Sequence, residues 1–326
     1  MPDASPVEHD RRTVAGPGAR SDPAWVFIAG YGRSGTTLLG MLLTRDAGFF
    51  CGELHLLWHA LVEGQTCQCG EPVAACPVWT RVAAHARAAL GLRSDEEGRA
   101  IMDQRLRRRH LLRPRLPAPR PAELELRAAT EAAVAEVTGA ELLVDSSKLS
   151  SVLWTACHID RDLSVVHLVR DPRAVAFSEG RPKPDPASPR GALVRRSVLD
   201  STAGWVLGHL TTERVVRRAV AEGRVGRARR VRYEDLAADP EGCVAALGVA
   251  PVGGRRHPGH AVAGNPSMFA PAAPVVVDDR WRTQMRAGPR LASTALTAPL
   301  LLRYGYALRP SGRAAGDGRA PVGGRG

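Results

Sequence analysis

A glycine-rich turn near the start of the chain carries several groups that can bind an anion. Residues 30–37 read Gly-Tyr-Gly-Arg-Ser-Gly-Thr-Thr, between a short apolar run and a stretch of helical periodicity at residues 36–44. Glycine lets the backbone bend so that its N–H groups converge, and the start of a helix adds unpaired donors and a positive dipole potential. One guanidinium and three hydroxyls supply further donors, those of Arg33, Ser34, Thr36 and Thr37. The pattern predicts a phosphate-binding loop.

The spacing of this loop nearly matches the loop that binds nucleoside triphosphates, Gly-x4-Gly-Lys-Ser/Thr. Gly30 and Gly35 are in register, but Thr36 occupies the lysine position. In triphosphate enzymes that lysine reaches the outer phosphates, and the next hydroxyl holds a metal ion. A phosphotransferase with a degenerate loop and an ordinary connection between strand and helix both stay open as alternatives at this point.

A second candidate anion site follows a later apolar run. Residues 163–169 are typical of a buried strand, and residues 170–178 continue as Arg-Asp-Pro-Arg-Ala-Val-Ala-Phe-Ser. Pro172 suits the first position of a helix. Arg170 at the end of the strand and Ser178 two turns into the helix can then approach one phosphate beside the first loop, because open α/β sheets bind ligands at this edge.

These two segments together resemble the cofactor signatures of the sulfotransferases that use 3'-phosphoadenosine-5'-phosphosulfate (PAPS). Five further blocks extend the resemblance over roughly residues 25–306: 51–53, 144–148, 231–240, 260–269 and 278–282. The resemblance implies a three-layer α/β/α fold with a central parallel sheet, similar to nucleotide kinases with a P-loop. It also implies transfer of a sulfuryl group from PAPS to a hydroxyl or an amine, without a catalytic metal.

The resemblance assigns a role to each matching residue. The 5'-phosphosulfate would be held by Arg33, Ser34, Gly35, Thr36 and Thr37. The 3'-phosphate would be held by Arg170 and Ser178, and the far side of the nucleotide by Tyr233 and Arg280. A phosphosulfate donor also accounts for the missing lysine of the loop, because no complex of triphosphate and metal has to be bound.

Attack on sulfur needs a base for the acceptor proton and a cation that faces the developing charge. Glu53 is the first candidate base, because it stands where related carbohydrate and tyrosylprotein enzymes carry a catalytic glutamate. The tyrosylprotein type has two consecutive acids and this chain has Leu54 at the second position, so His55 is the alternate base, with His59 behind it. Lys148 is the candidate cation, with Ser146 and Ser147 as additional donors.

The pattern of elements predicts the α/β fold independently. Short runs of strand type lie at residues 24–29, 141–145, 163–169 and 227–233. Helical stretches separate them at residues 36–44, 121–138, 149–158, 172–179 and 191–222. This order predicts a parallel sheet with helices on both faces.

The composition divides the chain into one domain at residues 24–309 and two ends, 1–23 and 310–326, that are predicted to be disordered. The arginine-rich segment 93–120 and the proline-rich segment 181–189 do not fit the core of the sheet. They are candidate lids, and insertions near 52–120 and 181–190 would form the walls of an acceptor site. Exposed connectors are the alternative interpretation.

The net charge of +12 makes anionic ligands plausible, and 43 of the 45 basic residues are arginines, leaving only Lys148 and Lys183. The arginines are spread along the whole chain, which argues against specific nucleic-acid binding, although a polyanion binder stays an alternative. No apolar run approaches the roughly 20 residues of a membrane span, and the first residues lack the pattern of a signal peptide. We therefore expect a cytoplasmic enzyme whose acceptor is a small molecule or a sugar.

Three of the six cysteines are crowded into residues 67–76, at Cys67, Cys69 and Cys76. Their spacing matches none of the common zinc patterns. The sequence favours reduced structural thiols over a metal site or a local disulfide.

Overall fold

The computed structural model describes residues 23–189, 191–248, 259–269 and 276–309. Its centre is a five-stranded sheet with the strand order β2-β3-β1-β4-β5, and all four neighbouring pairs are parallel. The strands are β1 (Ala24–Gly30), β2 (Phe49–Gly52), β3 (Leu142–Lys148), β4 (Leu163–Val169) and β5 (Arg227–Arg232). The sequence predicts four of these strands, and β2 is missing from the prediction because four residues are too few to show a period.

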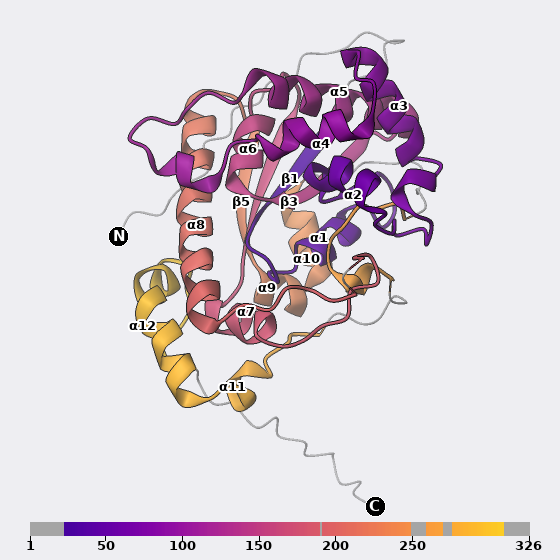
Figure 1. Cartoon of the computed structure of the whole chain (residues 1–326). Helices are drawn as coiled ribbons and strands as arrows, with labels where there is room; N and C mark the ends of the chain where they lie inside the picture. Colours follow the sequence, from indigo (N-terminus) through magenta and orange to yellow (C-terminus); the bar gives the residue numbers. More distant parts are fainter. Residues whose placement is uncertain (1–22, 190, 249–258, 270–275, 310–326) are drawn as a thin grey trace, which may run out of the picture.

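Helices cover both faces of the sheet (Figure 1). On one face Val26 and Ile28 of β1 pack with residues of α1 (Thr36–Leu43), α9 (Tyr233–Ala238) and α10 (Pro240–Leu247). Trp25 and Phe27 alternate to the other face. There they join a core with α2 (Leu57–Glu63), α3 (Trp79–Leu90), α5 (Pro121–Thr138), α6 (Ser150–Ala156) and part of α8 (Val198–Ala221). The predicted three-layer α/β/α fold is therefore confirmed.

The remaining helices lie at the margins of these layers. They are α4 (Asp95–Asp103), α7 (Pro172–Glu179), α11 (Trp281–Gln284) and α12 (Ala287–Arg303), with short 3-10 turns at Leu54–Leu56, Val73–Ala75, Arg108–Leu112 and Pro266–Phe269. Figure 1 shows α11 and α12 at the end of the molecule next to α7 and α8. Among the described residues, no helix is long and apolar enough to cross a membrane.

Two predictions about local structure need correction. The helix expected over residues 191–222 begins only at Val198, because the Ser197 side chain accepts a hydrogen bond from Asp200 N and caps it there. Residues 191–193 instead turn back along the proline-rich segment, with Leu193 N donating to Lys183 O at 3.0 Å. The arginine-rich segment 93–120 is not merely a surface connector, because it buries Met102, Leu106 and Leu111 in the core.

The sheet brings three strand ends to one edge. Gly30 at the end of β1 pairs with Leu168 of β4, and Ala29 pairs with Lys148 at the end of β3. A methyl group on Gly30 would lie 2.5 Å from Leu168 O, so only glycine fits this close approach. The loops that leave these three strands must therefore lie next to one another.

Candidate active site

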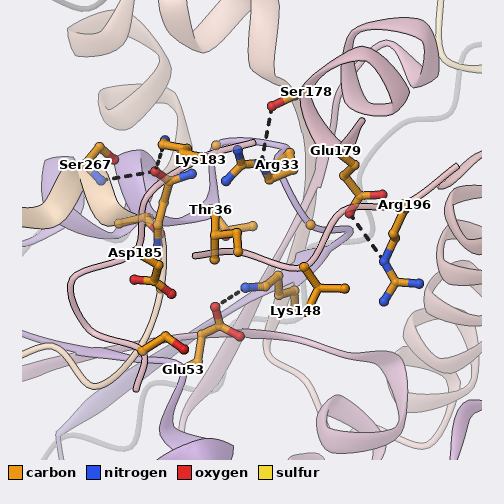
Figure 2. A pocket seen from close by; sticks show the side chains of 18 of the residues that line it. Arg33, Thr36, Glu53, Lys148, Ser178, Glu179, Lys183, Asp185, Arg196 and Ser267 are labelled. Carbon is orange, nitrogen blue, oxygen red and sulfur yellow. Dashed lines mark hydrogen bonds and ion pairs between the residues drawn. The ribbon is translucent and has the colours of Figure 1, made fainter. Parts of the chain in front are cut away.

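A cavity of about 1720 Å³ opens at this edge of the sheet. Ten of the twelve residues predicted for the site line it: Arg33, Gly35, Thr36, Thr37, Glu53, Lys148, Arg170, Ser178, Tyr233 and Arg280. Figure 2 shows Arg33, Thr36, Glu53 and Lys148 gathered around this space. Ser34 and His55 are not part of the lining.

The glycine-rich loop has the geometry of an anion cradle. Gly35 caps α1 in the left-handed conformation, with φ 90°, and no side chain caps the helix. The backbone N–H groups of the first turn are therefore available at the cavity. Arg33 is also left-handed, at φ 63°, which is uncommon for a residue with a side chain and is a kind of strain that gathers at functional sites. Burial lowers the pKa of the Arg33 guanidinium.

The two predicted anion-binding segments contact each other directly. Arg33 Nε donates to Ser178 Oγ at 3.2 Å, and Arg170 Nη1 donates to Arg33 O at 2.9 Å. The Arg170 guanidinium lies 4.3 Å from the centre of the Tyr233 ring. That ring also packs on Gly35, where a methyl group would lie 2.6 Å from it. Segments about 140 residues apart in the chain therefore form one continuous surface.

Asp278 holds the side chains of Arg170 and Arg280 in place. Asp278 lies 3.6 Å from Arg170 Nη2, and its backbone oxygen accepts a hydrogen bond of 3.0 Å from the same atom. Arg280 Nε donates to Asp278 Oδ1 at 2.7 Å. This hydrogen bond lowers the pKa of Asp278 and raises that of Arg280. Asp278 thus fixes both cations at the cavity wall.

Glu53 and Lys148 form an ion pair at the cavity, with 13% and 17% of their side chains exposed. Lys148 ends β3 in the left-handed conformation, with φ 53°, and Glu53 directly follows β2. The backbone N–H of Glu53 donates to Val262 O at 2.7 Å. Neighbouring strands and a returning segment of the chain therefore hold the base candidate and the cation candidate together.

A sequence model described as the sulfotransferase family matches residues 23–248. The chain belongs to the sulfotransferase family. No curated protein matches it.

Three solved structures are similar to this sulfotransferase at low identity. The sulfotransferase domain from the curacin biosynthetic pathway has 17% identity and a TM-score of 0.48, covering 89% of this chain and 100% of the other. The sulfotransferase domain of the Synechococcus PCC 7002 olefin synthase has 20% identity and a TM-score of 0.42, covering 89% and 98%. Sulfotransferase STF1 from Mycobacterium tuberculosis has 15% identity and a TM-score of 0.37, covering 70% and 67%.

His55, the alternate base in the sequence, does not line the cavity of this sulfotransferase. It is buried, and burial, followed by the nearby Arg105, lowers its pKa well below 6.5. His59 contacts Asp103 Oδ1 at 2.9 Å instead. Neither imidazole lines the cavity, so Glu53 is the base candidate that the structure brings to it.

The two serines before Lys148 do not supply donors to the cavity. Ser146 Oγ donates to Gly52 O at 3.0 Å, and Ser147 Oγ donates to Asp145 Oδ1 at 2.6 Å. Both side chains lie inside the fold because β3 continues to Lys148, beyond the predicted end of that strand. They fix the strand end, and only Lys148 reaches the cavity.

Sequence reasoning missed a chain of polar contacts that reaches the loop from two later segments. Lys183 Nζ donates to Asn265 Oδ1 at 2.6 Å, and Asn265 N donates to Thr37 Oγ1 at 3.0 Å. Burial, followed by the charge of Arg33, lowers the pKa of Lys183. The signal for Lys183 was available, because it is the second of the two lysines in an arginine-rich chain.

Both predicted insertions contribute to the cavity. The first supplies Leu56, Glu63, Gln65, Arg105 and Arg107, and the second supplies Arg181, Pro182, Lys183, Asp185, Ser188 and Pro189. Burial raises the pKa of Asp185 and also that of Glu179, which lies on the next part of the wall and faces Arg196 at 3.9 Å. This wall carries charges of both signs and is therefore suited to a polar molecule.

Proposed function

We propose that this sulfotransferase moves a sulfuryl group from PAPS to a hydroxyl, or an amine, of a small-molecule or glycan acceptor by in-line displacement. One observation carries the proposal: the glycine-rich loop and the segment 170–178 touch each other through Arg33 and Ser178 at one cavity. The same cavity holds the Glu53 and Lys148 pair. The segments that would bind a nucleotide with two anionic groups therefore lie beside the pair that would carry out the transfer.

The polar groups around the loop fit such a nucleotide. Arg33 Nη1, Ser34 Oγ and Arg170 Nε, in the two anion-binding segments, are among the buried side-chain atoms of the described residues that have no hydrogen-bond partner. Buried donors of this kind are costly unless a ligand satisfies them. Arg33, Ser34, Gly35, Thr36 and Thr37 would hold the 5'-phosphosulfate, and Arg170 with Ser178 the 3'-phosphate. Tyr233 and Arg280 would contact the rest of the nucleotide.

The reaction assigns complementary tasks to the paired residues. Glu53 takes the proton of the acceptor hydroxyl while the acceptor oxygen bonds to sulfur. The bond between sulfur and the bridging oxygen breaks, and its electron pair leaves with 3'-phosphoadenosine-5'-phosphate. The Lys148 ammonium faces that bridging oxygen and stabilises its charge. When the donor draws Lys148 away, the carboxylate of Glu53 is freed to accept the proton.

Calorimetry with 3'-phosphoadenosine-5'-phosphate tests the donor, and labelled-sulfate transfer to a panel of alcohols, phenols, amines and glycans tests the acceptor. We expect the wild type to bind 3'-phosphoadenosine-5'-phosphate. Arg170→Ala should bind it about 10- to 100-fold more weakly, because one charged hydrogen-bonding group is removed. Arg217→Ala, an exposed change on α8 outside the cavity lining, is the control and should bind as the wild type does. Binding of ATP with Mg²⁺ in preference to the adenosine bisphosphate would support the degenerate phosphotransferase instead.

A further inference from the structure

Four soft ligand groups meet at a second place in the molecule, outside the cavity. Cys67, Cys69 and Cys76 lie here with His260, and their sulfur and ring nitrogen atoms are all within 4.8 Å of one another. Cys67 and Cys76 are buried and Cys69 is exposed. Cys76 Sγ is 3.3 Å from His260 Nδ1. The cluster joins a loop after α2 to a segment that lies 184 residues further along the chain.

Backbone hydrogen bonds hold the three cysteines in place. Cys67 N donates to Glu71 O at 2.8 Å and Gly70 N donates to Cys67 O at 2.9 Å, which closes a tight turn between the first two cysteines and Glu71. Thr80 N donates to Cys76 O at 3.0 Å, which holds the third cysteine just before α3. Hydrogen bonds around the ligand residues fix the orientation of a metal site.

The histidine is positioned as firmly as the cysteines. The Trp79 indole Nε1 donates to His260 O at 2.5 Å, and the neighbouring Ala261 N donates to Gln68 Oε1 at 3.2 Å. Gln68 N in turn donates to Ala261 O at 3.2 Å. The segment that carries His260 is therefore fixed to the residue between Cys67 and Cys69. This fixed imidazole distinguishes the cluster from three thiols that merely pack together.

We propose that Cys67, Cys69, Cys76 and His260 form a structural zinc site. Zinc prefers four tetrahedral ligands of this soft kind, with Zn–S near 2.3 Å and Zn–N near 2.0–2.1 Å. Those lengths place neighbouring ligand atoms roughly 3.5–3.8 Å apart, within about an ångström of the spacing here. Four protein ligands leave no open coordination position, so the ion would stabilise the fold and would not take part in sulfuryl transfer.

The site would support the active site indirectly. From His260 the chain runs beside β2, where Val262 N donates to Cys51 O at 2.9 Å and Val262 O accepts from Glu53 N at 2.7 Å. The same segment continues to Asn265, which donates to Thr37. Zinc would therefore anchor the strip of chain that holds the backbone of Glu53 and the start of α1. The zinc proposal stands on its own contacts and does not depend on the identity of the sulfuryl donor.

Metal content and cobalt substitution of the full chain, purified under reducing conditions with any affinity tag removed, test this proposal. We expect about one zinc ion per chain after gel filtration, since four protein ligands form a closed site. Co²⁺ added to the metal-free chain should give the absorption of a tetrahedral site and a thiolate-to-cobalt charge-transfer band. Cys67→Ser and Cys76→Ser should retain almost no metal, and His260→Ala should shift the cobalt spectrum. Cys243→Ser, which removes a thiol on α10, should behave as the wild type.

A measurement on the unmutated chain keeps the proposal testable if the serine variants do not fold. Removing zinc with a chelator should lower the melting temperature of the wild type, and adding Zn²⁺ back should restore it. Denatured chain that has been purified without reductant should show six free thiols. Four thiols with no retained metal would show a disulfide in place of the zinc site. A cobalt spectrum without thiolate bands would also overturn the proposal.

Discussion

The cavity is bordered by two kinds of structure. On the loop side, residues 30–37 and 170–178 each run without interruption from a strand through a turn into a helix. On the wall side, residues 56–63, 105–107, 181–189, 192–196 and 264–267 contribute single side chains from separate parts of the chain. The loop side presents backbone N–H groups and fixed arginines, which suit a constant anionic donor. The wall side can change by substitution without disturbing the sheet, which suits a variable acceptor.

The largest effect on turnover should come from changes to Glu53 and Lys148, the ion pair at the border between the loop side and the wall side. We expect Lys148→Ala and Glu53→Ala each to lower turnover about 10²-fold or more, because one removes a charge stabiliser and the other a proton acceptor. The measurement is the rate of labelled-sulfate transfer, with circular dichroism and melting temperature as checks on the fold. Near-normal turnover in either variant removes that residue from the proposed chemistry.

Exposed Glu125 on α5 provides a matched control, since Glu125→Ala removes a carboxylate that does not line the cavity. The double variant adds a further test of the pair. If Glu53 and Lys148 work as a unit, Glu53→Ala with Lys148→Ala costs clearly less than the product of the two single losses. Losses that multiply would show that the two residues act independently.

A change confined to the loop side should have a smaller effect. Gly35→Ala places a methyl group 2.6 Å from the Tyr233 ring at a position where φ is 90°. We expect binding of 3'-phosphoadenosine-5'-phosphate to weaken about tenfold, because the methyl group displaces the loop or the Tyr233 ring and restoring the binding geometry costs roughly 1–2 kcal/mol. Isothermal calorimetry gives this affinity directly.

Gly64→Ala is a close control for this change. Gly64 also has a positive φ, of 67°, but a methyl group there meets no atom within 4 Å. It should reduce stability without changing nucleotide affinity. Equal affinity losses in the two variants would mean that the fit between Gly35 and Tyr233 is unimportant and that both losses reflect a less stable fold.

The difference between the loop side and the wall side also determines how much of the site the sequence can predict. Glycine, hydroxyl and arginine types over eight consecutive residues indicate the phosphate loop, because the glycines and the helix start that shape that turn are adjacent in the sequence. The sequence also predicts the positions of Arg170 and Ser178, because one follows a strand and the other lies two turns into the next helix. Strand β2 could not be found, because its four residues are recognisable only beside β3.

Long-range contacts account for what the sequence misses, both on the wall side and at the cysteine cluster outside the cavity. Lys183 and Asn265 meet 82 residues apart, and His260 reaches Cys76 across 184 residues. The spacing of the three cysteines alone indicated packing thiols, because their fourth partner is supplied by the fold. The sequence also could not predict where the Ser146 and Ser147 side chains lie, because this depends on how far β3 extends.

The smallest effect should arise where the two sides are connected. Lys183 contacts Asn265, and Asn265 holds Thr37 through its backbone N–H, which Lys183→Ala leaves in place. We therefore expect Lys183→Ala to weaken 3'-phosphoadenosine-5'-phosphate binding only about three- to tenfold, the range of one ordinary hydrogen bond, with turnover at saturation nearly unchanged. Asn265→Ala combined with Lys183→Ala should add little to Asn265→Ala alone, because both changes remove the same contact. A loss in Lys183→Ala as large as that in Arg170→Ala would place Lys183 on a phosphate, and the loop side would then extend across the cavity into the proline-rich segment.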